Sequence, residues 1–241
     1  MLHSILNNFC KYKSISNKTN IGFLIIILFG ILLSSCEKDS DIENNIFKYN
    51  EYSNISSLDP AFSSTLRNIW PVNQIFNGLV QLDKNLEIKG DIASSWTISE
   101  DKRTYTFKIR QDVYFHNSEL FGKNLTRKVK AKDFEYSFNR LIDNKIASPG
   151  YWVFNNVKDF KAINDSIFQI ELKKEFDPFL GILSMKYCSV VPHEIVTVLG
   201  DKFSKKPIGT GPFKFKKWDE NVKLVLSKKK NYFEYDSLGQ K

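Results

Sequence analysis

The sequence is poor in the residues that build most catalytic centres. It contains three histidines and three cysteines in 241 residues, and none of them falls into an HExxH, CxxC or paired-histidine spacing. The Gly-x-Ser-x-Gly elbow of serine hydrolases is absent as well. We therefore expect a protein that is not an enzyme and that carries neither a cofactor nor a metal.

An apolar run long enough to span a bilayer is also missing near the N-terminus. The run from Ile21 to Leu33 has thirteen residues, which rise only about 20 Å as a helix, short of a hydrocarbon core of about 30 Å. Lys11, Lys13 and Lys18 precede it, and the first 35 residues contain no Asp or Glu. This pattern predicts a secretory signal over residues 1–35.

Cys36 follows this run in the sequence Leu33-Ser34-Ser35-Cys36, which resembles the bacterial lipobox. The resemblance implies that Cys36 becomes the lipid-modified first residue of the mature chain. Residues 36–45 are polar and acidic, and we interpret them as a flexible tether. They also resemble acidic signals that send some lipoproteins to the cell surface. Cys188 is then the only free cysteine of the mature chain, so no intrachain disulfide is expected. Its apolar surroundings indicate a position in the core.

The formal net charge is +8, with an isoelectric point near 9.2. Such an excess of positive charge is found in proteins that bind nucleic acid or anionic membranes. Here the lysines occur along the chain together with 27 acidic residues, which favours a solvated lysine-rich surface. No nucleic-acid partner is expected.

Apolar periodicity predicts a mixed α/β domain in which strands and helices do not strictly alternate. Helices are expected at 67–76 and 133–142, and a further one starts at Asp177-Pro178. The expected strands are 46–49, 104–109, 113–115, 157–163, 167–172, 212–218 and 222–227. The last four strands form two pairs, 157–163 with 167–172 and 212–218 with 222–227, and suggest hairpins around 164–166 and 219–221.

Gly209-Thr210-Gly211-Pro212 first suggests a phosphate-binding loop. It leads, however, into the alternating stretch Phe213 to Trp218, which predicts a strand, and Pro212 lacks the amide that a phosphate would need. We therefore interpret it as a structural turn, in which the glycines permit unusual φ values and Pro212 stiffens the strand entry.

This turn resembles a signature of the extracellular solute-binding proteins of family 5, the peptide- and nickel-binding group that serves ABC importers. Further motifs of that family follow one another in its order over residues 46–241. They are Leu58-Asp59-Pro60, Phe76-Asn77-Gly78-Leu79, Ile92 to Trp96, Tyr105 to Arg110, Val113 to His116, Val129 to Phe134, Tyr136-Ser137-Phe138 and Asn231-Tyr232-Phe233. Asn117-Ser118 departs from the Asp-Gly that the family usually has, which changes a turn.

The resemblance implies a periplasmic-binding-protein-like type II fold that is incomplete. Residues 46–79 and 189–241 would form the first lobe, residues 80–188 an inserted subdomain, and the second lobe is missing from these 241 residues. A half-cleft covers one side of a ligand, so this chain alone is expected to bind peptide weakly or not at all.

The family also implies where a ligand would lie. An oligopeptide would bind as an added strand, held by the peptide groups of Ser64, Thr65 and Leu66. Tyr151 or Trp152 could supply an aromatic wall. The alternatives are a plain surface loop at 61–67 and subdomain packing at 151–152.

The implied function is a lipid-anchored receptor that delivers oligopeptides to the permease subunits of an ABC importer. It would face the periplasm or stand at the outer membrane or cell surface. A nickel-complex or other small-solute receptor is the alternative within this class. A surface lipoprotein that acts as an adhesin or scaffold is the alternative from another class.

Overall fold

A computed structural model describes residues 46–235 and residue 239. The chain divides into two compact units, residues 1–50 and 51–241. Residues 46–50 of the first unit form neither helix nor strand and are exposed, so the prediction of a strand over 46–49 is wrong. The signal, Cys36 and the tether lie outside the described residues.

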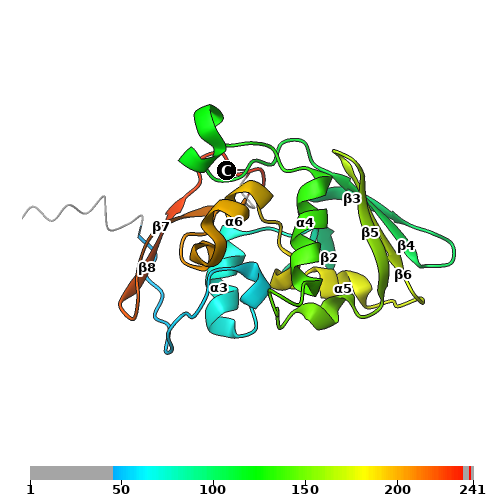
Figure 1. Ribbon diagram of the computed structural model, residues 1–241, viewed down its shortest axis with the longest axis horizontal. Coiled ribbons are helices and arrows are strands. Elements are labelled where there is room, and N and C mark those ends of the chain that lie inside the picture. Colours follow the sequence, from blue (N-terminus) through cyan, green and yellow to red (C-terminus); the bar gives the residue numbers. More distant parts are fainter. Residues whose placement is uncertain (1–45, 236–238, 240–241) are drawn as a thin grey trace, which may run out of the picture. The chain divides into compact units, whose positions relative to one another are not determined.

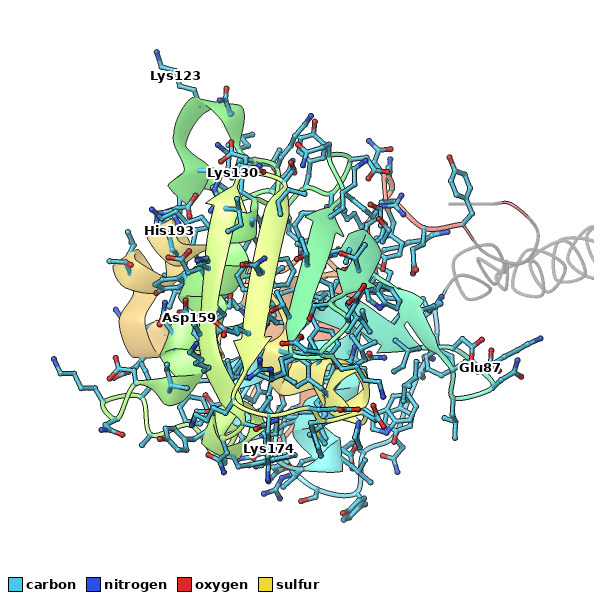
Figure 2. The ribbon with its side chains drawn as sticks, turned by 90° about the vertical axis from the view of Figure 1, so that its right-hand side faces the viewer. Glu87, Lys123, Lys130, Asp159, Lys174 and His193 are labelled. Atoms are coloured by element: carbon cyan, nitrogen blue, oxygen red, sulfur yellow. The ribbon has the colours of Figure 1, made fainter. Side chains whose placement is uncertain are left out.

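The centre of the second unit is an antiparallel sheet of four strands in the order β3-β4-β6-β5. Its strands are β3 (Ala93–Ile98), β4 (Thr104–Ile109), β5 (Val157–Asn164) and β6 (Ile167–Leu172). Along β4 and β6 every second residue is buried, as the alternation in the sequence requires. The outer face of the sheet is covered with polar side chains, among them Asp159 of β5 (Figure 2).

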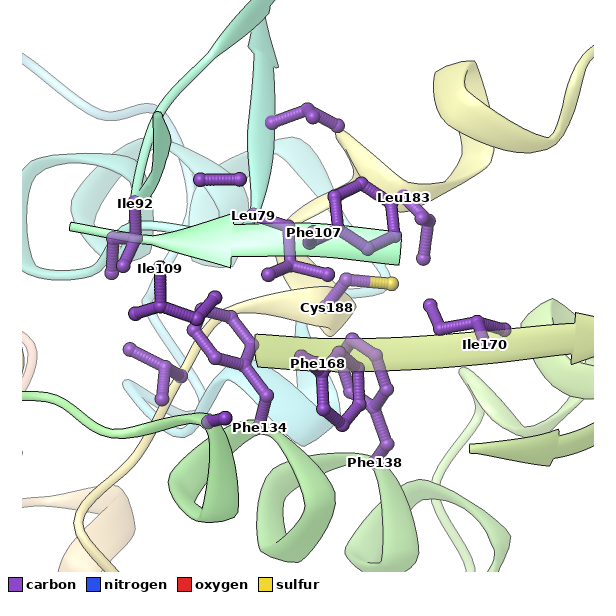
Figure 3. Close-up of a cluster of buried hydrophobic side chains, with 14 of the residues drawn as sticks. Leu79, Ile92, Phe107, Ile109, Phe134, Phe138, Phe168, Ile170, Leu183 and Cys188 are labelled. Carbon is purple, nitrogen blue, oxygen red and sulfur yellow. The ribbon is translucent and has the colours of Figure 1, made fainter. Parts of the chain in front are cut away.

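Helices cover the inner face of this sheet. Helix α4 (Ala131–Ile142) directs Phe134 and Phe138 toward Phe168 of β6, with ring centroids 5.9 and 5.5 Å from it. Helix α5 (Phe179–Leu183) adds Phe179, whose ring lies 5.1 Å from that of Tyr105. Cys188 lies within the same cluster of fully buried side chains (Figure 3), as expected. Burial raises the pKa of its thiol to about 12.

A second hydrophobic cluster joins segments that are far apart in the sequence. It contains side chains of α3 (Leu66–Ile75) and α6 (His193–Leu199), together with the inner face of a hairpin made by β7 (Phe213–Asp219) and β8 (Lys223–Lys228). Figure 1 shows α3 and α6 beside this hairpin. The predicted division into residues 46–79, 80–188 and 189–241 stays a prediction.

The remaining elements are short. Strands β1 (Val80–Leu82) and β2 (Ile88–Gly90) form a separate antiparallel pair. Of the predicted strand 113–115, only a single bridge from Tyr114 to Lys128 is present. The 3-10 helices are η1 (Pro60–Phe62), η2 (Glu119–Asn124), η3 (Tyr151–Phe154), η4 (Lys186–Cys188) and η5 (Gly200–Ser204). In the part of the chain that the structure describes, no helix is long and apolar enough to cross a membrane.

Candidate ligand-binding site

The predicted ligand-binding residues follow a turn that Asp59 fixes. The Asp59 side chain accepts a hydrogen bond from the amide of Ala61 at 3.0 Å and so caps η1. The same carboxylate forms an ion pair with Arg140 of α4 at 2.6 Å, with side chains only 5% and 10% exposed. The Leu-Asp-Pro motif therefore attaches this turn to the helix that covers the sheet.

Two further side chains hold the same stretch from either side. Asn68 accepts from the amide of Ser56 at 3.1 Å and donates to the carbonyl of Phe62 at 3.3 Å. Ser148 donates its hydroxyl proton to the carbonyl of Ala61 at 2.6 Å. Hydrogen bonds from protein side chains to the backbone thus hold the chain between Asp59 and Asn68 in place, and they do not depend on a ligand.

Ser64, Thr65 and Leu66 lie on this fixed stretch, and all three are exposed. Thr65 is the N-cap of α3 with extended backbone, φ −128° and ψ 151°, and its side chain makes no capping bond. Within the described residues, the amides of Thr65 and Leu66 have no hydrogen-bond acceptor. Free amides at a helix start need an outside partner, either water or a ligand.

Tyr151 and Trp152 begin η3 and are 52% and 44% exposed. Both follow Gly150, which packs so closely on the ring of Tyr187 that an added Cβ would lie 2.6 Å from Tyr187 Cδ1. Tyr187 also lies near Ser64, because burial raises the pKa of Tyr187 and the Ser64 side chain acts against this rise. The structure therefore brings both predicted segments to one residue, Tyr187, which sequence reasoning did not single out.

A different set of family motifs meets in a buried polar junction. We define it as Asn77, Asp91, Thr210 and Tyr232, which come from four separate segments of the sequence. Asn77 donates to Asp91 and to the Tyr232 hydroxyl, each at 2.8 Å, and accepts from the Thr210 hydroxyl at 2.9 Å. Asp91 also accepts from the amide of Gly78 at 2.9 Å. The junction joins the Phe-Asn-Gly-Leu, Gly-Thr-Gly-Pro and Asn-Tyr-Phe motifs.

The protonation of the junction depends on burial. Burial raises the pKa of Asp91 to about 7, against the attraction of the neighbouring Lys186 ammonium and the hydrogen bond from Gly78. Burial also raises the pKa of Tyr232, helped by the nearby carboxylates of Asp91 and Glu234. Asn77 and Asp91 are only 5% and 2% exposed, and their hydrogen-bond partners lie inside the protein. The junction therefore stabilises the fold.

Gly209 and Gly211 are needed for close approach and not for unusual φ values, which corrects the sequence interpretation. Neither has a positive φ. A Cβ added to Gly209 would lie 2.1 Å from the carbonyl oxygen of Ile75, and one on Gly211 would lie 2.5 Å from that of Gln74. The loop therefore packs directly on the last turn of α3, where the amide of Gly211 donates to the Ile75 carbonyl at 2.8 Å.

His116 is buried behind the same loop, as a hydrogen-bonded structural residue. Its Nε2 lies 2.8 Å from the carbonyl oxygen of Gly211, which can only accept, so Nε2 is the protonated nitrogen. Burial lowers the pKa of His116 to about 3, so the ring is neutral and serves to hold the loop.

Two other features of the described residues do not coincide with the predicted site. A half-open hollow of about 280 Å³ lies between His116, Pro207 and β7, and none of the five predicted contact residues lines it. Asp133, His193 and Glu194 lie close enough together to hold a metal. Arg127, however, already forms ion pairs with both carboxylates, so its charge occupies the position that a cation would take.

Residues 87–240 match the family described as bacterial extracellular solute-binding proteins, family 5 Middle. The chain belongs to this family. It is 26% identical over 182 residues to the glutathione-binding protein GsiB of Escherichia coli O1:K1 / APEC, an alignment that covers 76% of this chain and 34% of GsiB. The chain thus spans about a third of the length of the curated relatives that it matches.

Solved structures of related proteins have the same fold. The periplasmic binding protein DppA from Helicobacter pylori, in complex with the peptide STSA, superposes with a TM-score of 0.68 at 32% identity, over 74% of this chain and 38% of DppA. NikZ from Campylobacter jejuni, in complex with Ni(L-His), gives 0.65 at 30% identity, over 76% of this chain and 35% of NikZ. The described residues therefore form part of a mixed α/β, type II periplasmic-binding-protein-like fold.

Proposed function

We propose that this chain is the substrate-binding part of an ABC importer and that it binds oligopeptides without catalysing a reaction. The observation that carries the proposal is the pair of unpartnered amides at Thr65 and Leu66, on a stretch that the Asp59–Arg140 ion pair and Asn68 hold in place. A peptide beside the extended Thr65 would accept from its amide as in an added strand, and the Leu66 amide would donate to a second acceptor of the same ligand. The H. pylori relative with a bound peptide supports this ligand class.

The exposed apolar side chains around this stretch would contact the ligand's side chains. Leu66 is 67% exposed, and Tyr151 and Trp152 lie on the segment that shares Tyr187 with Ser64. These surfaces are open, so they desolvate only one side of a peptide while the cost of ordering it remains. We therefore expect affinities weaker than micromolar for these 241 residues alone.

An amide-detected NMR titration of the mature chain tests this function. Mixed tri- to pentapeptides at up to millimolar concentration should shift the signals of residues 64–66 and 151–152 together. Glutathione and Ni(L-His), the ligands that relatives carry in their names, should shift them less. Larger and saturable shifts with Ni(L-His) would support the small-solute alternative, and no localised shift with any ligand would contradict the proposed site.

We also propose that Cys36 carries the lipid that anchors the mature chain to a bacterial membrane, where permease subunits would receive the ligand. The support is the lipobox-like Leu33-Ser34-Ser35-Cys36 directly after a short apolar run. Radiolabelled palmitate should enter the wild-type protein and should not enter Cys36→Ser. Equal labelling of both would contradict the anchor.

A further inference from the structure

The positive charge of this protein is concentrated in one segment. Residues 200–230, which we call the basic segment, contain ten lysines and three carboxylates, a net charge of +7. The whole chain carries +8, so the other 210 residues together carry only +1. The lysines that accompany acidic residues elsewhere are balanced, whereas those of the basic segment are not.

The fold turns these lysines toward solvent. In the β7–β8 hairpin, Phe215 pairs with Leu226 and Trp218 with Leu224, and all four pack on the second hydrophobic cluster. Because neighbouring residues of a strand point to opposite faces, the positions between them form the outer face. That face carries Lys214 opposite Ser227, Lys217 opposite Val225 and Lys223 opposite Asp219.

Most of this charge has no internal counter-ion. Within the described residues, only two ion pairs involve the basic segment, Lys205 with Glu220 and Lys217 with Asp219. Six lysines are exposed and have no ion-pair partner among those residues: Lys202, Lys206, Lys216, Lys223, Lys228 and Lys230. On the four-stranded sheet, by contrast, Lys158 lies 2.7 Å from Glu171. A cluster of unpaired like charges repels itself and attracts an anionic partner.

The second unit of the chain begins beside this cluster. Ile55 packs on the same hydrophobic cluster as Trp218 and Leu224, and the amide of Leu58 donates to the carbonyl of Ser204 at 2.9 Å. The first residues of the second unit therefore lie beside the basic segment.

We propose that the exposed lysines of the basic segment form a membrane-facing surface that binds the phosphate groups of anionic lipids. This inference takes its orientation from the proposed anchor at Cys36. A polybasic patch beside the anchor adds an attraction to anionic lipids and determines which side of the protein faces the membrane. Each lysine contributes when it lies within about a Debye length, about 10 Å at 0.1 M salt, of the charged surface.

Vesicle binding of the unacylated chain tests this surface separately from the anchor. Residues 51–241 form a compact unit apart from residues 1–50, so the chain can be made from residue 36 with Cys36→Ser. It should sediment with vesicles of phosphatidylcholine and phosphatidylglycerol, not with phosphatidylcholine alone, and 0.5 M salt should release it. Replacing Lys216, Lys223, Lys228 and Lys230 with Gln should weaken the partition coefficient by at least about tenfold.

A control variant with the same change in net charge shows whether position matters. Lys108, Lys145, Lys161 and Lys174 are exposed outside the basic segment, and Lys174 is labelled in Figure 2. Their replacement by Gln should change the partition coefficient less than about twofold. A Lys→Arg version of the four basic-segment changes should bind like the wild type, which separates loss of charge from loss of folding.

Three outcomes would overturn the proposal. They are equal losses in the two Gln variants, no binding of the wild type to anionic vesicles, and binding to a DNA duplex in place of vesicles. Palmitate labelling of the full chain reports on Cys36 alone, so failure of the anchor and failure of the basic surface give different results.

Discussion

The buried polar junction and the exposed stretch at residues 64–66 both lie at or next to family motifs. They differ in whether their polar groups have hydrogen-bond partners inside the protein. In the junction, Asn77 satisfies Asp91, Thr210 and Tyr232 inside the protein. At residues 65 and 66, the backbone amides have no acceptor among the described residues, although the stretch itself is held firmly. A motif with internally satisfied groups serves the fold, and a fixed motif with unsatisfied groups is available to a ligand.

Breaking the support of the exposed stretch should have the largest effect on stability. Arg140→Met leaves Asp59 buried without its ion-pair partner, which should cost about 3–5 kcal/mol in the free energy of unfolding. Arg103→Met removes an exposed ion pair with Asp101 and should leave the midpoint of unfolding close to that of the wild type. Urea unfolding measures both, and similar costs for the two variants would show that the Asp59–Arg140 pair does not hold the turn.

Removing a side chain of the buried polar junction should have the next largest effect on stability. Asn77→Ala leaves buried groups of Asp91, Thr210 and Tyr232 without a partner, so we expect a loss of about 1–3 kcal/mol. Asn85→Ala, at an exposed position, should change stability by less than about 0.5 kcal/mol. If Asn77→Ala unfolds at the wild-type urea concentration, the junction does not stabilise the fold.

A smaller effect should appear in the pH dependence of stability. The pKa of Asp91 is raised to about 7, so its contribution is fully present below the unfolded value near 4 and is lost as pH rises through 7. Asp91→Asn should therefore cost more stability at pH 5 than at pH 8. Unfolding curves at the two pH values check this, and a larger cost at pH 8 would mean that Asp91 is ionised in the folded protein.

The stabilising contribution of His116 should show the opposite pH dependence in the same unfolding assay. Its pKa is lowered to about 3, so its contribution is present above the unfolded value near 6.5 and is lost as pH falls toward 3. His116→Gln should therefore cost more at pH 8 than at pH 5. An equal cost at both values would show that the folded ring takes up a proton like an exposed histidine.

Local patterns in the sequence predicted much of the fold. The strand 104–109, the hairpin of β5 and β6, the β7–β8 hairpin and the helices α3 and α4 all follow from alternation or helical spacing within one segment. Strands β1 and β2 were missed because each has only three residues, too few to show a period. Residues 46–49 alternate like a strand but form none in the structure, and alternation alone provides no pairing partner.

The long-range contacts of the site could not be read from the sequence in the same way. Asn77 and Thr210 are separated by 133 positions, and no spacing rule places them together. Tyr187 contacts both predicted ligand-binding segments, yet it lies in a stretch whose apolar pattern indicates only a core position. The close packing of Gly209 on α3 also needed the structure, because a glycine indicates either a special φ or a close approach.

The central claim is that the backbone at residues 65 and 66, and not a side chain, binds the ligand. Leu66→Pro tests it with little effect on the fold, because Leu66 is the first residue of α3, where proline is favoured, and the extended Thr65 suits the residue before proline. Leu66→Ala is the matched control, because it removes the side chain and keeps the amide.

The decisive measurement is an NMR titration of both variants with tri- to pentapeptides. We predict that Leu66→Ala keeps the wild-type affinity within about threefold, whereas Leu66→Pro weakens it by about tenfold, the value of one lost hydrogen bond of about 1.4 kcal/mol. Equal affinities of Leu66→Pro and Leu66→Ala, with both variants folded, would contradict the account.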